Sequence, residues 1–221
     1  MCGIVGYFGN SDAVPLLLKG LKRLEYRGYD SAGLAIMSGD SFMVNKKAGK
    51  VAELESLVSE SGLTGSVGIG HTRWATHGEP SDLNAHPHTD YSGKFALIHN
   101  GIIENYAALK KLLEQKGVEF RTQTDTEVLV QLISNIYHEQ DTTFETAVTS
   151  ALEKVVGTYG IVVMCSDEPN QLIAARLGSP LVLGVGEGEY FIASDASPLV
   201  EYTRNVIYLG DRECLFIGDD G

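Results

Sequence analysis

The sequence predicts an α+β fold in which two β-sheets are layered with helices. The predicted elements follow one another as a group of strands, a group of helices and a second group of strands. A doubly wound parallel sheet would instead need a regular alternation of strand and helix. Several strand-like segments are apolar throughout, which is typical of strands covered on both faces. No low-complexity linker or internal repeat divides the 221 residues, so we expect a single domain.

Two groups of apolar runs mark the strands. The first group comprises Gly3 to Phe8, Leu34 to Met37, Phe42 to Asn45, Val67 to His71 and Phe95 to His99. The second group comprises Ile161 to Cys165, Gln171 to Ala175, Leu181 to Val185, Tyr190 to Ala193, Val206 to Leu209 and Cys214 to Ile217. Gly184, Gly186 and Gly188 lack the third glycine of a dinucleotide-binding fingerprint and lead into a strand, so they predict a hairpin turn.

Apolar residues at helical spacing predict five helices between these strand groups. The stripes of the first two are Val14, Leu17, Leu18, Leu21 and Leu24, behind Ser11 as a possible N-cap, and then Val51, Leu54, Leu57 and Val58. The third helix is expected from Asn105 to Lys116, with Gly117 placed to end it. Thr124 with Glu127, and Thr142 with Glu145, have the spacing of capping boxes that open the fourth and fifth helices.

Composition restricts the possible partners. With 43% hydrophobic and 21% charged residues the chain has an ordinary globular composition, and no apolar run approaches the length of a membrane span. The start MCGIVGYFG lacks the basic and apolar regions of a secretory signal, so the expected compartment is the cytoplasm. A net charge of −12 opposes binding to a phosphate backbone, which makes nucleic acid an unsuitable partner.

Cys2 is the most unusual placement in the sequence. Once Met1 is removed, the thiol and a free α-amine belong to the same residue. An α-amine with a pKa near 7.7–8.0 can accept the proton of a thiol with a pKa near 8.5, so nucleophile and base are combined in one residue. A buried terminal strand that happens to begin with cysteine is the structural alternative. Cys165 and Cys214 lie in apolar runs without a CxxC pair and are expected to be buried core residues.

The segment HTRWATHGEP, residues 71–80, combines two histidines, an arginine and the only tryptophan. The planar fork of Arg73 can hold a carboxylate through two parallel hydrogen bonds, although a surface salt bridge would also use an arginine. A histidine metal site would use His71, His77, His86 and His88. No cysteine or HExxH pattern joins these histidines, so we expect no metal.

Asn100 and Gly101 follow a predicted strand in the segment LIHNGIIEN. A side-chain amide next to a glycine, whose N–H can closely approach a ligand, supplies two donors for a developing oxyanion. An Asn-Gly pair is also a strong hairpin signal. However, the following residues lead into a helix instead of a return strand.

Two further polar positions have both structural and functional interpretations. Asp125 lies in the first turn of the fourth helix, where an acidic residue favours the helix dipole and where it could also hold a substrate ammonium. Arg27 lies in the loop of LEYRGYDSAG, which by itself indicates only a polar connection between a helix and a strand.

The chain resembles the class II glutamine amidotransferases, also called N-terminal nucleophile amidotransferases. Six motifs carry the resemblance in order: MCGIVGYFG, EYRGYDSAG, HTRWATHGEP, NAHPH, HNGIIEN and TDTEV. Within this family, the second and third motifs are similar to those of the glutaminase half of glucosamine-6-phosphate synthases. The resemblance extends over the whole chain and implies a four-layer αββα fold of the N-terminal nucleophile hydrolase type.

The resemblance implies a role for each site residue. Cys2 would attack the side-chain amide of L-glutamine, and Asn100 and Gly101 would form the oxyanion hole. Arg73 would bind the substrate carboxylate, with Thr76 and His77 in support, and Asp125 would bind the substrate ammonium. Trp74 resembles a gate between the glutamine site and an ammonia passage, and Arg27 resembles a supporting residue. The implied reaction is hydrolysis through a γ-glutamyl thioester, without a cofactor.

The family's complete synthases also carry a sugar-phosphate isomerase half. The end CLFIGDDG predicts a strand and a turn without a following partner strand, so we expect the glutaminase part, residues 1–221, of a longer enzyme. That enzyme would be a homo-oligomer in which the ammonia converts fructose 6-phosphate to glucosamine 6-phosphate. The alternatives are the glutaminase domain of another class II amidotransferase, a free-standing glutaminase, and a catalytically silent glutamine-binding module.

Overall fold

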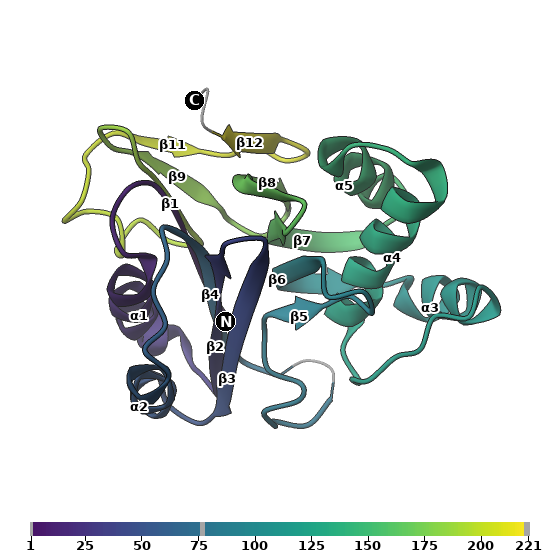
Figure 1. Cartoon of the computed structure of the whole chain (residues 1–221), viewed down its shortest axis with the longest axis horizontal. Coiled ribbons are helices and arrows are strands. Elements are labelled where there is room, and N and C mark those ends of the chain that lie inside the picture. Colours follow the sequence, from purple (N-terminus) through teal and green to yellow (C-terminus); the bar gives the residue numbers. More distant parts are fainter. Residues whose placement is uncertain (1, 76–77, 219–221) are drawn as a thin grey trace.

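Four layers stack side by side in the computed structural model, which describes residues 2–75 and 78–218 (Figure 1). Helices α1 and α2 cover one sheet, helices α4 and α5 cover the other, α3 packs against α4, and the two sheets face each other between the helices. The order of the strands is β11-β9-β10-β1-β4-β2-β3 in the first sheet and β12-β8-β7-β6-β5 in the second. The expected four-layer αββα architecture is therefore confirmed.

Each sheet is built from antiparallel neighbours. The first sheet contains β1 (Gly3–Phe8), β2 (Ser31–Ser38), β3 (Ser41–Ala48), β4 (Val67–Arg73), β9 (Val182–Val185), β10 (Tyr190–Ala193) and β11 (Val206–Tyr208). The second contains β5 (His88–Thr89), β6 (Phe95–Ile103), β7 (Gly157–Cys165), β8 (Glu168–Leu177) and β12 (Cys214–Gly218). The predicted hairpin turn at Gly186 and Gly188 joins β9 to β10. The two-residue strand β5 was missed because it is too short to show a period.

The helices are α1 (Ala13–Leu24), α2 (Val51–Ser61), α3 (Tyr106–Gln115), α4 (Asp125–Gln140) and α5 (Phe144–Leu152), with a short 3₁₀ turn η1 (Glu25–Arg27). The predicted N-cap position is wrong by one residue for two helices. Asp12 caps α1 in place of Ser11, because its carboxylate accepts from the N–H of Val14. Thr143 caps α5 in place of Thr142, because its hydroxyl accepts from the N–H of Thr146.

The cap of α4 is the predicted one, although only half of the expected capping box forms. The Thr124 hydroxyl accepts from the N–H of Glu127 at 3.2 Å. The Glu127 carboxylate does not return to Thr124; it accepts from the N–H groups of Arg121 and Thr122. This carboxylate therefore ties the preceding loop to the helix, and it fixes the position of Asp125 at the start of α4.

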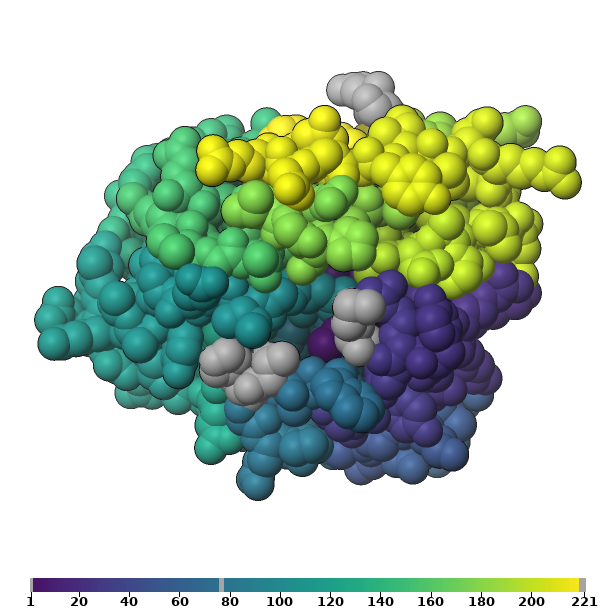
Figure 2. Space-filling model, turned by 180° about the vertical axis from the view of Figure 1, so that it is seen from behind, coloured from purple at the N-terminus to yellow at the C-terminus, as the bar shows by residue number. Residues whose placement is uncertain are grey.

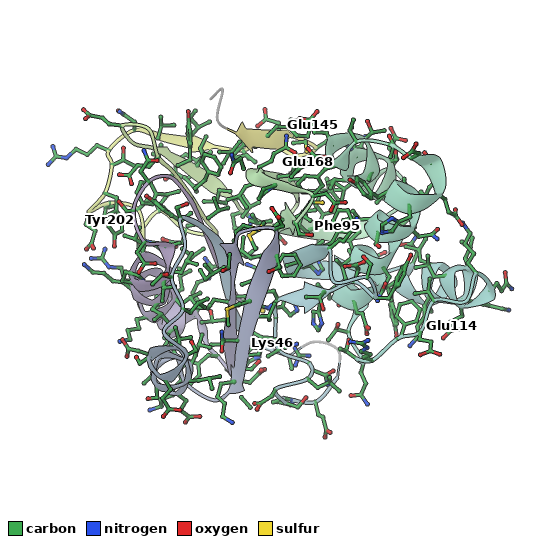
Figure 3. All side chains as sticks on the ribbon, viewed as in Figure 1. Lys46, Phe95, Glu114, Glu145, Glu168 and Tyr202 are labelled. Carbon is green, nitrogen blue, oxygen red and sulfur yellow. The ribbon has the colours of Figure 1, made fainter. Side chains whose placement is uncertain are left out.

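Three apolar cores separate the four layers. Leu17 and Leu21 of α1 pack into the core beneath the first sheet. Ile69 and Ile98 lie in the core between the sheets, which covers one face of β4 and of the buried first part of β6. Phe95, labelled in Figure 3, lies in the third core, where its ring contacts those of Tyr137 and Phe144.

Among the described residues, no helix combines the length and the apolar character needed to cross a membrane.

Candidate active site

A pocket of about 370 Å³ opens where the start of β1, the end of β4, the end of β6 and the start of α4 meet. It is lined by Cys2, Arg27, Arg73, Trp74, His86, His99, Asn100, Gly101, Ile102, Thr124, Asp125, Thr126, Thr158, Ser179 and Pro180. Figure 2 shows this face of the molecule, with the dark purple start of the chain in a recess between blue and teal segments. Seven site residues expected from the sequence line this one pocket; the other two, Thr76 and His77, lie outside the described residues.

Cys2 directly precedes β1, whose first residue pairs with Thr72 of β4. This pairing places the Cys2 sulfur beside the end of β4, where it accepts a hydrogen bond from the N–H of Trp74 at 3.0 Å. Burial raises the pKa of the Cys2 thiol, and the hydrogen bond from Trp74 opposes this effect. The resting group is therefore a protonated thiol, which needs a base before it can act as a nucleophile.

Asn100 and Gly101 lie within β6, which continues to Ile103 in register with β7. The hairpin alternative for this Asn-Gly pair is therefore wrong. The Asn100 amide Nδ2 donates to the Cys2 carbonyl at 3.2 Å, so the side chain lies directly against the cysteine. Gly101 has a φ of 132°, and a Cβ at this position would lie 2.1 Å from the Thr158 carbonyl. Only glycine fits this approach of β6 to β7.

Two buried groups of opposite charge line the same pocket. Arg73 is 4% exposed, which excludes the surface salt bridge considered from the sequence. Its guanidinium donates to the carbonyls of Gly78 and Glu79, at 3.0 Å and 3.4 Å. The carboxylate of Asp125, also 4% exposed, accepts from the N–H of Ile103 at 2.8 Å. The pocket can therefore receive a ligand that carries both a carboxylate and an ammonium group.

Arg27 and Trp74 form part of the pocket wall. Arg27 donates to the Ser194 carbonyl at 3.2 Å and lies 3.7 Å from the carboxylate of Asp195, so it connects η1 to the segment after β10. Trp74 is 55% exposed, and its ring covers Gly28, where a Cβ would lie 2.5 Å from the ring. Gly28 also has a φ of 98°, so this packing requires glycine at the position.

Buried histidines form a group at the pocket, where His86 and His99 belong to the lining, and sequence reasoning missed the organisation of this group. His71 and His86 stack with ring centroids 4.1 Å apart, and His86 contacts His88 edge to face at 4.7 Å. His99, which the sequence did not single out, lies in the same group and contacts Thr126 of α4. The only sequence signal for His99 is a polar residue inside an apolar strand run.

The metal alternative finds no support in residues 2–75 and 78–218, where no group of three or more histidine, cysteine or acidic side chains could hold a metal ion. Burial lowers the pKa of His71 from 6.5 to about 3. Burial and neighbouring charges also lower the pKa values of His86 and His88 well below 6.5. These three histidines are therefore neutral near pH 7 and act as hydrogen-bonding groups.

We expect the free energy of unfolding to decrease as the pH falls below about 6.5. The unfolded histidines bind protons in this range, whereas the folded ones, with depressed pKa values, do not. Their contribution is complete above pH 6.5 and is lost progressively towards pH 3, the folded pKa of His71. Each proton of difference adds about 1.4 kcal/mol per pH unit to the slope. Urea denaturation over a series of pH values measures this slope of the free energy of unfolding.

Two variants test this assignment. His88→Gln removes one buried titrating group, so the slope of stability against pH should become shallower. Val148→Ala removes methyl groups from the core beneath α5 and should lower stability without changing the slope. An unchanged slope in His88→Gln would contradict the assignment.

Comparison with known proteins gives three kinds of match. The family model described as a glutamine amidotransferase domain matches residues 71–201. The glutamine–fructose-6-phosphate aminotransferase [isomerizing] of Bacteroides thetaiotaomicron is 57% identical over 98% of this chain, and that of Chlorobaculum tepidum is 57% identical over 100%. The chain spans 36% of the length of each relative.

Among solved structures, the glutamine phosphoribosylpyrophosphate amidotransferase from B. subtilis, complexed with ADP and GMP, is similar over the whole chain. The match has a TM-score of 0.84 and 30% sequence identity, and it covers 48% of that protein. The likeness thus includes the arrangement of both sheets and their covering helices.

Proposed function

The chain belongs to the glutamine amidotransferase family, and from this premise we propose that it hydrolyses L-glutamine to glutamate and ammonia, with Cys2 as the nucleophile. One observation carries the proposal: the Cys2 thiol, the Asn100 amide and two buried, oppositely charged side chains line a single pocket. A nucleophile, an oxyanion donor and a clamp for an amino-acid end are the groups that amide hydrolysis of glutamine needs.

The reaction has two steps. In the first, the α-amine of Cys2, freed by removal of Met1, accepts the thiol proton, and the sulfur attacks the side-chain amide carbon. The C–N bond then breaks, and the proton leaves with the nitrogen as ammonia. In the second step, water attacks the γ-glutamyl thioester, which breaks the C–S bond and releases glutamate and the thiol.

We assign the oxyanion to Asn100 and Gly101. Nδ2 of Asn100 carries two hydrogens, and the Cys2 carbonyl accepts one of them, which aligns the amide beside the sulfur. Gly101 is the next residue of β6 and lines the same pocket. A donor in this position stabilises the negative charge that develops on the substrate oxygen in the transition state.

The amino-acid end of glutamine is assigned to Arg73 and Asp125. The guanidinium would bind the α-carboxylate and the Asp125 carboxylate the α-ammonium, because both side chains are buried and line the pocket. Thr76 and His77 keep their proposed supporting role in substrate binding. Arg27 is proposed to hold the wall of the pocket through Ser194.

The proposed activity is tested directly with the purified chain, after mass spectrometry has verified that Met1 is removed. With glutamine we expect equal amounts of glutamate and ammonia. Addition of fructose 6-phosphate should give no glucosamine 6-phosphate, because the chain spans 36% of the relatives that carry the full aminotransferase name. Stoichiometric glutamine binding without glutamate release would instead identify a silent binding module.

Arg73→Gln and Asp125→Asn should each raise KM for glutamine about 10- to 100-fold, because a charge-assisted hydrogen bond contributes about 1.5–3 kcal/mol. We expect much smaller changes in kcat, since these contacts are made in both the ground state and the transition state. Steady-state glutaminase assays measure both parameters. Asparagine keeps an acceptor for the N–H of Ile103, so the change at position 125 removes mainly charge.

A matched substrate separates the two assignments. Glutaramate, which is glutamine without its α-amino group, should be a poor substrate of the unchanged chain. Asp125→Asn should lose much of the preference for glutamine over glutaramate, whereas Arg73→Gln should keep it. A preserved preference in Asp125→Asn would show that this carboxylate does not bind the ammonium.

In the full-length enzyme we propose that this domain, residues 1–221, supplies ammonia for the conversion of fructose 6-phosphate to glucosamine 6-phosphate. The names and identities of the relatives support this proposal. Trp74, exposed at the pocket, is the proposed gate between the two reactions. The homo-oligomeric state and cytoplasmic location of that enzyme are further proposals, which light scattering and cell fractionation test.

A further inference from the structure

We propose that His71 is a positioning residue that holds the Asn100 amide with its nitrogen, and not its oxygen, facing the reacting sulfur. The inference rests on the proposed glutaminase function and extends it to a side chain outside the pocket lining. His71 is completely buried in β4, and its Nε2 lies 2.9 Å from Oδ1 of Asn100. It therefore acts on the reaction only through Asn100.

The hydrogen bonds of His71 distinguish the oxygen from the nitrogen of the Asn100 side-chain amide. Nε2 also lies 3.1 Å from the backbone carbonyl of His99, which can only accept, so Nε2 must carry the proton. The atom of Asn100 that faces this N–H must then be the amide oxygen. At the other end of the amide, the Cys2 carbonyl can only accept, so the atom facing it must be the nitrogen. Two independent contacts thus give the same orientation.

Further hydrogen bonds fix the groups around His71. The N–H of His99 donates to Nδ1 of His86, which leaves the proton of neutral His86 on Nε2, facing Thr126. Nε2 of His99 faces the Thr158 carbonyl and carries the proton there, so Nδ1 of His99 accepts from the Thr126 hydroxyl. This arrangement fixes the His99 carbonyl and, by stacking, the His71 ring.

The orientation matters because the two ends of an amide have opposite effects on an oxyanion. With the present orientation, an N–H of Nδ2 faces the developing negative charge. A rotation by half a turn about the last side-chain bond would present the amide oxygen instead and repel that charge. Such a rotation would also place the amide nitrogen, a donor, against the Nε2–H of His71. His71 therefore disfavours the unproductive orientation through a group that never touches substrate.

The test compares His71→Leu, which removes the donor, with His71→Gln, whose amide nitrogen can occupy the place of Nε2. For His71→Leu we expect kcat for glutamine hydrolysis to fall about 10- to 100-fold, which does not exceed the decrease expected when one oxyanion donor is removed. KM for glutamine should change less than about threefold. For His71→Gln we expect most of kcat to return. Alkylation of Cys2 by iodoacetamide forms no oxyanion, so its rate, followed by peptide mass spectrometry, should be unchanged in both variants.

A double-mutant cycle supplies the decisive readout. If His71 acts through Asn100, adding His71→Leu to Asn100→Ala should lower kcat by less than about twofold further. Val148→Ala, in the core beneath α5, controls for lost stability and should keep kcat. If His71→Leu does not fold, His71→Asn replaces it, because asparagine is one methylene too short to place its nitrogen at Nε2.

Three results would overturn the inference: an unchanged kcat in His71→Leu, a loss of kcat in His71→Gln as large as that in His71→Leu, or a double mutant in which the two single losses multiply. All three comparisons require that the unchanged chain hydrolyses glutamine. Absence of activity in the unchanged chain with a verified free Cys2 would contradict the proposed function instead.

Discussion

Cys2→Ala should abolish glutamine hydrolysis, and Cys2→Ser should lower kcat by more than about 10³-fold. Alanine removes the proposed nucleophile, and an amine with a pKa near 8 deprotonates a serine hydroxyl much less readily than a thiol. Both variants should still bind glutamine, since Arg73 and Asp125 are unchanged. Isothermal titration of Cys2→Ala and initial-rate assays of Cys2→Ser measure the two expectations.

Cys214→Ser is the matched control. Cys214 lies in β12, outside the pocket lining, and burial raises the pKa of its thiol to about 11. Its replacement should leave glutaminase activity unchanged. Equal losses at Cys2 and Cys214 would indicate a general sensitivity to cysteine replacement.

The proposed mechanism also requires a free α-amine on Cys2. A chain that keeps Met1, or carries an N-terminal tag, has an amide nitrogen in place of the basic amine, although its thiol is intact. We expect such a chain to be nearly inactive, and proteolytic release of Cys2 should restore hydrolysis. Full activity of a chain shown by mass spectrometry to retain Met1 would exclude an N-terminal nucleophile mechanism.

Asn100→Ala should lower kcat about 10²- to 10³-fold, with little change in KM. In the proposed role the Asn100 amide stabilises charge that exists only in the transition state, so its removal should leave ground-state binding intact. The hydrogen bond to the Cys2 carbonyl is lost too, and the rate of Cys2 alkylation therefore serves as a control for the position of the sulfur. A rise in KM with unchanged kcat would place Asn100 in substrate binding.

Asn100→Asp is the near-isosteric companion. It keeps the size of the side chain and an acceptor for Nε2 of His71, but it places a carboxylate oxygen where the donor stood. We expect a loss of kcat at least as large as that of the alanine variant. A milder loss in the aspartate variant would mean that the size of this side chain matters more than its N–H.

The sequence predicted the elements more reliably than their ends. The apolar runs of β1 and β10 have the predicted bounds, because β1 begins next to the N-terminus and ends before Gly9, and β10 lies between Gly188 and the polar pair Ser194 and Asp195. The expected caps of α1 and α5 were each displaced by one residue, because adjacent Ser11 and Asp12, and adjacent Thr142 and Thr143, offer equivalent oxygens. Only the backbone geometry of the finished helix selects between such neighbours.

The sequence likewise predicted some parts of the candidate site and missed others. Local motifs pointed to Cys2, Arg73, Asn100 and Asp125, because each of these polar residues lies in or beside a predicted strand or helix in a short, unusual run of residues, and all four line the pocket. The histidine group could not be found in this way. His71 and His99 are 28 positions apart, and their hydrogen bond depends on how two sheets face each other. The sequence grouped three of these histidines as a possible metal site, whereas the packing places their rings against one another and Nε2 of each against a protein oxygen.

The place of β1 in the first sheet has a consequence for motion at the catalytic end of the chain. Terminal residues usually fray, because few contacts hold them. Here the strand that follows Cys2 is hydrogen-bonded on both sides, to β10 and to β4, and the N–H of Ile4 also donates to the Ser194 hydroxyl. Detaching this strand would break two strand pairings at once and open the interior of the sheet. The backbone next to the proposed nucleophile thus shares the slow, global opening of the core, and we expect amide hydrogen exchange along β1 to report the unfolding of the whole domain.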